Sequence, residues 1–172
     1  MEQKYPGITG SISAAVRNVV TQVIADSLPG LRKQIEQLVA DNFDAVEQRE
    51  TYDFLASPAG RKMVAMGDKI YNQDKLRAGM AKLPPEQRKL TGEALAAAID
   101  PDFVTLLTPD ELAAVNAFAA SAGGSKMAAT TPQLQTLIAT WANTTLAGHG
   151  DEIRAATIQQ IDTFIAKSGK PL

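Results

Sequence analysis

Apolar residues recur every three or four positions along most of the chain, which is the period of one face of a helix. The first such stretch, residues 8–26, predicts an amphipathic helix, and Leu28-Pro29-Gly30 separates it from a second helix over 30–48. Convincing alternating patterns of the kind that strands show are absent. The pattern therefore predicts an all-α protein, a bundle of about seven or eight helices.

Polar and proline-containing breakers divide the rest of the chain. Ser57-Pro58 starts a helix, and Lys82-Leu83-Pro84-Pro85 is the clearest break between helices. Thr108 followed by Glu111 three residues later predicts a capping box. The predicted helices that follow cover residues 58–82, 85–99, 109–120, the stretch after 125 to about 146 with a kink or split at Pro132, and 151–167.

One segment of the chain is repeated sixty-four residues further on. Phe54–Met63 returns as Phe118–Met127, and seven of nineteen positions are identical between residues 52–70 and 116–134. Phe, Ser, Gly, Lys and Met keep their spacing in both copies. The chain is therefore predicted to be one helical domain, 1–172, that contains a duplicated helix–corner–helix unit over 31–76 and 95–140.

The repeated motif resembles the bacterial domain-of-unknown-function family 2059, whose hallmark is L-T-x-x-E-L followed by F-Y-x-S-P-x-G-x-K. The later copy matches through Leu107-Thr108-Pro109-Asp110-Glu111-Leu112, Phe118, Ser121, Gly124 and Lys126, and the earlier copy through Phe54, Ser57, Pro58, Gly60 and Lys62. The later copy has Ala122 where the family prefers proline, and the earlier copy lacks the Thr-Pro-x-Glu start. The resemblance implies an all-helical protein, usually exported to the periplasm of Gram-negative bacteria, with no established activity.

Composition narrows the class of partner. A net charge of −2 and a pI near 5.4 disfavour nucleic-acid binding, and Asp68 and Asp74 interrupt the basic residues at Arg61-Lys62 and along Lys69–Lys82. No apolar run is long enough to span a bilayer. Met1-Glu2-Gln3-Lys4 does not lead into a signal peptide, although a chain from which a signal had been removed would look the same. The absence of cysteine excludes disulfides and thiolate chemistry, and fits either a reducing or an oxidising compartment.

Candidate catalytic groups are few. His149 is the only histidine, and its flanking glycines predict an exposed loop position, so a zinc site or general-base role is disfavoured. Asp41, Asp44, Glu47 and Glu50 recur every three residues, which predicts a solvated acidic face, with a weak hard-cation site as the alternative. The sequence therefore predicts a non-enzymatic protein without a cofactor or a metal.

The two corners carry one structural and one functional interpretation. In the structural one, the phenylalanines anchor a helix, the serines cap the next helix, the glycines let two backbones pass closely, and Met63 and Met127 fill the gap behind. In the functional one, the free amides at the start of each second helix bind an anion. The candidate anion-binding residues are Ser57, Arg61, Lys62, Ser121 and Lys126.

The amphipathic helix 8–26 is the candidate for interaction. Its apolar stripe can dock on the bundle, pair with a second copy in a homodimer, or cover an apolar groove that accepts a lipid or a partner helix. The leading hypothesis is thus a non-enzymatic envelope protein that binds a protein partner or an apolar ligand. The alternative is a small-anion binder that uses the two corners.

Overall fold

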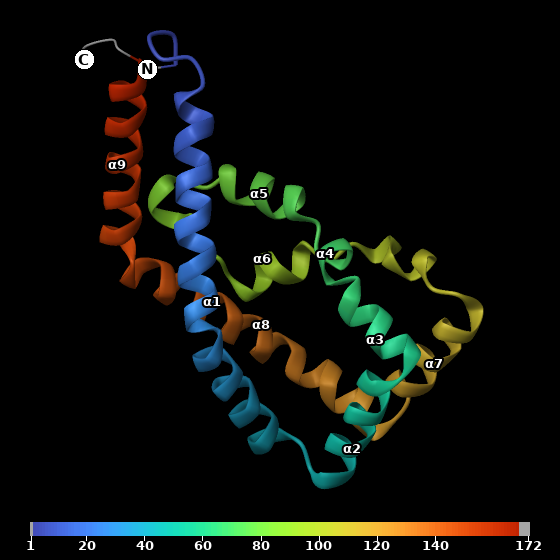
Figure 1. The fold of residues 1–172 in the computed structure, drawn as a ribbon. Coiled ribbons are helices and arrows are strands. Elements are labelled where there is room, and N and C mark those ends of the chain that lie inside the picture. The colour runs from blue at the N-terminus through green and yellow to red at the C-terminus, as the bar shows by residue number, and fades with distance from the viewer. Residues whose placement is uncertain (1, 169–172) are drawn as a thin grey trace. The chain divides into compact units, whose positions relative to one another are not determined.

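The computed structural model describes residues 2–168, apart from the side chains of Asp68 and Pro85. Within that range all regular elements are helical, and the only extended pairing is an isolated antiparallel bridge between Tyr71 and Ile99. The prediction of an all-α protein is confirmed (Figure 1). The elements in chain order are α1 Ile8–Asn42, α2 Ala45–Ala56, α3 Pro58–Ala65, α4 Gly67–Ile70, α5 Gln73–Ala81, η1 Pro85–Gln87, α6 Gly92–Ala97, η2 Pro101–Leu106, α7 Pro109–Ala119, α8 Ala122–Gly148 and α9 Gly150–Ser168.

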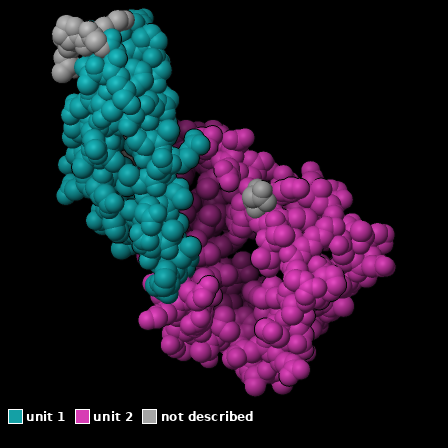
Figure 2. Space-filling model, viewed as in Figure 1, with its two compact units in different colours: residues 1–31, 141–172 teal, residues 32–140 magenta. Residues whose placement is uncertain are grey.

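The chain divides into two compact units, which Figure 2 shows in two colours. Unit 1 holds residues 1–31 and 141–172, and unit 2 holds residues 32–140. Almost all of both repeated segments lies in unit 2.

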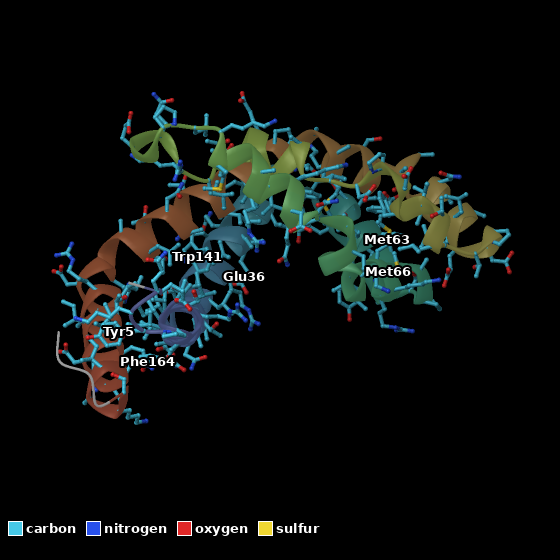
Figure 3. All side chains as sticks on the ribbon, turned by 90° about the horizontal axis from the view of Figure 1, so that it is seen from above. Tyr5, Glu36, Met63, Met66, Trp141 and Phe164 are labelled. Carbon is cyan, nitrogen blue, oxygen red and sulfur yellow. The ribbon has the colours of Figure 1, made fainter. Side chains whose placement is uncertain are left out.

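Unit 1 pairs the N-terminal part of α1 with α9. The Gln160 amide donates to the Ser11 hydroxyl at 2.6 Å, and Tyr5 and Ile8 are buried. Tyr5 and Phe164 lie together at one end of the helix pair (Figure 3). Gly7 has a φ of +88°, a conformation that favours glycine, and this lets the N-terminal turn fold back at the same end. The apolar stripe of the predicted helix 8–26 thus lies beside a helix of its own chain.

The predicted break at Leu28-Pro29-Gly30 is wrong, because α1 runs through Pro29 and ends only at Asn42. A proline inside a helix removes one main-chain hydrogen bond, and that loss does not end a helix that is held on both sides. Val23 and Leu31 provide that support, since both are buried. Likewise, Pro132 lies inside α8 and does not split it.

The predicted helix 58–82 is three helices, α3, α4 and α5. The interruption has a tertiary cause: the Asn72 amide donates to the Ala98 carbonyl and the Asp100 amide donates to the Ile70 carbonyl, both at 2.8 Å. The Asn72 side chain then caps α5 by accepting from the Lys75 amide at 2.9 Å. The predicted helix 85–99 is shortened to α6 in the same region, with η1 before it.

Candidate functional site

The two corners between α2 and α3 and between α7 and α8 have the same local geometry. At the first, the Ser57 hydroxyl accepts from the Gly60 amide at 3.1 Å, and the Ser57 amide donates to the Phe54 carbonyl at 2.9 Å. Both distances recur at the second corner. The equivalent residues there are Phe118, Ser121 and Gly124. The prediction that these serines cap the following helices is confirmed.

The glycines Gly60 and Gly124 are required by close approach of the main chain. A Cβ at Gly60 would overlap the Phe54 carbonyl oxygen, and one at Gly124 would overlap the Phe118 carbonyl oxygen. Main-chain atoms cannot rotate aside as a flexible side chain can, so each corner admits only a residue without a side chain. The predicted role of these glycines in letting two backbones pass is confirmed.

A capping box begins each unit of the repeat, including the earlier one. Asp44 accepts from the Glu47 amide at 2.9 Å, and the Glu47 carboxylate accepts from the Asp44 amide at 2.9 Å. In the later unit Thr108 and Glu111 exchange the same two bonds at 3.3 and 2.8 Å. The earlier copy lacks the Thr-Pro-x-Glu start, as the sequence shows, but Asp44 performs there the capping role that Thr108 has in the later copy.

The lysine of each repeated unit pairs with the glutamate of the other unit. The Lys62 ammonium lies 2.5 Å from the Glu111 carboxylate, and the Lys126 ammonium lies 3.6 Å from the Glu47 carboxylate. The rings of Phe54 and Phe118, one from each unit, stack with their centroids 4.1 Å apart and their planes within 1° of parallel. A contact in which residue i meets j while j meets i is the signature of a two-fold relation, here between two halves of one chain. We call these six residues the twin corner.

Carboxylates of both units accept hydrogen bonds from the opposite unit or form ion pairs with it, and this changes the interpretation of Glu47 and Glu50. The Lys62 ammonium, followed by the Thr108 amide, donates to Glu111 and lowers the pKa of that carboxyl. The Glu50 carboxylate accepts from the Gly123 amide of α8 at 2.7 Å. The predicted solvated acidic face is therefore wrong for Glu47 and Glu50, both of which face the later unit of the repeat.

All five candidate anion-binding residues lie at the corners, and each one has a partner within the protein. Lys62 and Lys126 pair with carboxylates, and Arg61 donates to the Ala56 carbonyl. Ser57 and Ser121 accept from main-chain amides. An anion at either corner has to displace a carboxylate from its lysine, so the anion site stays a prediction that no contact favours.

An apolar pocket of about 300 Å³ lies in unit 2, between α1, α2 and α8. The walls combine aliphatic and aromatic side chains with a few hydroxyls and one amide. They are formed by Ile35, Leu38, Val39, Phe43, Gln48, Thr51, Tyr52, Leu55, Met127, Thr130, Thr131 and Leu134. The helical stripe that the sequence shows over 30–48 is thus only partly covered, because Ile35, Leu38 and Val39 are half-buried. Met127 lines this pocket from behind the second corner.

The polar groups of the pocket wall are mostly engaged. The Gln48 amide donates to the Phe43 carbonyl at 3.0 Å, and the Thr131 hydroxyl donates to the Met127 carbonyl at 2.8 Å. The Thr51 hydroxyl is buried and has no hydrogen-bond partner. The pocket therefore offers an incoming molecule mainly hydrocarbon contact. Its volume is at the lower end of the range for small-molecule sites, about 300–1,000 Å³.

His149 is not the exposed loop residue that its neighbours predict. It lies between the end of α8 and the start of α9 and is half-buried. Its Nδ1 is 2.8 Å from the Thr145 carbonyl, which means that Nδ1 carries the proton and donates. Among the side chains that the structure describes, no three from His, Cys, Asp or Glu come together as ligands for one metal ion.

Comparison with known proteins adds no assignment: no family model, no curated protein and no solved structure matches this chain. None of the helices within the described range combines the length and the apolar character that crossing a bilayer requires.

Proposed function

We propose that this protein is a non-enzymatic binding protein of the bacterial envelope that takes up an apolar ligand between α1, α2 and α8. The assignment to the envelope rests on the resemblance of the repeated motif to the exported family. The observation that carries the binding function is the apolar pocket of about 300 Å³. Filled helical bundles bury such stripes against one another, whereas here Ile35, Leu38 and Val39 stay half-buried around an opening.

The volume limits the size of the ligand. A water molecule occupies about 30 Å³ in the liquid and a methylene group is of similar size, so the pocket holds about ten such groups. A single alkyl chain of about eight to ten carbons fits this space. Burial of each methylene contributes about 0.8 kcal/mol, so affinity should rise about fourfold with each carbon until the pocket is full.

The test is a fluorescence titration with N-phenyl-1-naphthylamine, a probe that emits strongly in apolar sites, followed by its displacement with alcohols of increasing chain length. We expect displacement to strengthen up to about ten carbons and then to level off. A series without this plateau would show that the pocket does not set the length of the ligand.

A pair of variants locates the probe. Val39→Phe combined with Thr131→Phe narrows the pocket from two opposite helices, and we expect it to weaken probe binding at least tenfold. Val64→Phe is the matched control, because Val64 is 68% exposed on α3 and lines no part of the pocket. Equal affinities in the two proteins would refute binding at this site. If a soluble amphipathic peptide displaced the probe better than any alcohol, the result would favour a protein partner.

A further inference from the structure

Positive charge is concentrated in one part of unit 2, from α4 to the turn after η1. Residues 67–89 hold six Lys or Arg against three Asp or Glu, whereas the rest of the chain holds eleven against sixteen. All six basic side chains are exposed: Lys69, Lys75, Arg77, Lys82, Arg88 and Lys89. This segment is thus the basic part of a chain whose net charge is −2.

Most of this charge is not neutralised within the protein. Arg77 meets Asp74 at 3.5 Å, a loose and exposed pair, and Arg88 donates to the Leu83 carbonyl at 2.9 Å. The side chains of the four lysines in this segment make no hydrogen bond or ion pair to the residues that the structure describes. Their charges are therefore available to an external anionic partner.

Apolar side chains lie among these cations. Leu76 and Met80 of α5 line two neighbouring surface hollows. Arg77 and Arg88 line the hollow of about 670 Å³. Lys75, Leu83 and Lys89 line the hollow of about 340 Å³, in which Glu93 is the one carboxylate among the described residues. Two more apolar side chains are exposed in the same segment: Tyr71 at 38% and Leu83 at 39%.

We propose that residues 67–89 dock on the surface of an anionic lipid bilayer. Lipid headgroups meet the lysines and arginines, while Tyr71 and Leu83 enter the boundary between headgroups and acyl chains. Nucleic acid would use the charge but gives the apolar side chains no role. An acidic partner protein would leave vesicles of either composition unbound, which is an outcome of the first test.

The first test measures binding to vesicles of phosphatidylcholine alone and of phosphatidylcholine mixed with phosphatidylglycerol. We expect binding only to the mixed vesicles. The variant Lys75→Gln, Lys82→Gln, Lys89→Gln should lose about a hundredfold in partitioning, since each basic residue near an anionic surface contributes about a factor of five. The side chains of these three lysines have no partner among the described residues, so the substitutions should leave the fold unaffected.

The control carries the same change in net charge elsewhere: Arg17→Gln, Lys33→Gln, Lys167→Gln, all at exposed positions of α1 and α9. We expect it to bind within about threefold of the unchanged protein. An equal loss in both variants would show that net charge alone drives the association, and would overturn the proposal. Binding that is absent, or equal for neutral and anionic vesicles, would overturn it as well.

The second test reports the orientation. Because the chain has no cysteine, Leu83→Cys can be labelled at a single position with an environment-sensitive fluorophore. Its emission should shift to the blue on addition of mixed vesicles, while the same label at Val64→Cys, on exposed α3, should not respond. A response at both positions, or at neither, would contradict docking through residues 67–89.

Discussion

Replacing the corner glycines with alanine should destabilise the protein, although alanine is the better helix former. Gly60 and Gly124 lie in the first turns of α3 and α8, where a gain of up to about 1 kcal/mol would be expected from helix propensity alone. Against this, the new Cβ would overlap the carbonyl oxygen of Phe54 or Phe118, and the nearest Cα atoms would lie at 2.7 and 2.9 Å. All of these are main-chain atoms, so relief requires the two helices of the corner to move apart.

The steric clash costs more than the gain in helix propensity returns. Overpacking a well-filled site costs about 1–3 kcal/mol, and more where the backbone must move. We expect Gly60→Ala and Gly124→Ala each to lower the free energy of unfolding by at least about 2 kcal/mol. For a chain of this size that corresponds to a fall in Tm of about 4–8 °C.

A matched substitution isolates the effect of close approach. Gly79 lies inside α5, and a Cβ there would meet nothing within 4 Å. Gly79→Ala should therefore raise stability by about 0.5–1 kcal/mol. Thermal unfolding of the three variants by circular dichroism is the measurement. If Gly60→Ala and Gly124→Ala melted at or above the temperature of Gly79→Ala, the role assigned to both corners would be wrong.

Three further predictions concern the earlier and later units of the repeat. Asp44→Ala should lose about 1 kcal/mol in urea unfolding, because it removes the cap of α2, and an unchanged midpoint would argue against the capping box. Thr51→Val should raise stability by about 1 kcal/mol, because it removes a buried hydroxyl without a partner, and a destabilised variant would mean that the hydroxyl is bonded. The lowered pKa of Glu111 means that its contribution to stability is complete above the ordinary carboxyl range and is lost as the pH falls through the lowered value. Glu111→Gln, which keeps a capping side chain but not the charge opposite Lys62, should therefore flatten the acid limb of the stability profile, and two parallel profiles would contradict this.

Local signals in the sequence predicted local structure well. The serine caps, the capping box at Thr108 and the need for glycine at 60 and 124 all depend on residues within a few positions of one another. Such features depend on hydrogen bonds and close contacts between residues near one another in sequence. They therefore form in the same way whichever helices pack around them.

Features that depend on tertiary partners were not predictable. Helix 58–82 breaks because Ile70 and Asn72 bond to the segment around Ala98, which no local pattern indicates. The acidic residues Glu47 and Glu50 looked solvent-facing because their partners lie more than seventy residues away. The pocket likewise needs three helices at once. The sequence signals the pocket only through the apolar stripe over 30–48. The same stripe is expected for a helix that packs against a filled core, so the pattern does not distinguish the two cases.

The exchanged lysine–glutamate pairs bear on the origin of this chain. A single unit that carried both Glu47 and Lys62 would possess each half of a reciprocal contact, so two copies of it would satisfy one another across an axis through their stacked phenylalanines. Duplication and fusion of such a self-associating hairpin would turn an intermolecular bond into an intramolecular one. Joined halves would then be free to diverge, and the pocket shows such asymmetry, since α1 precedes the earlier unit and forms one of the pocket's walls.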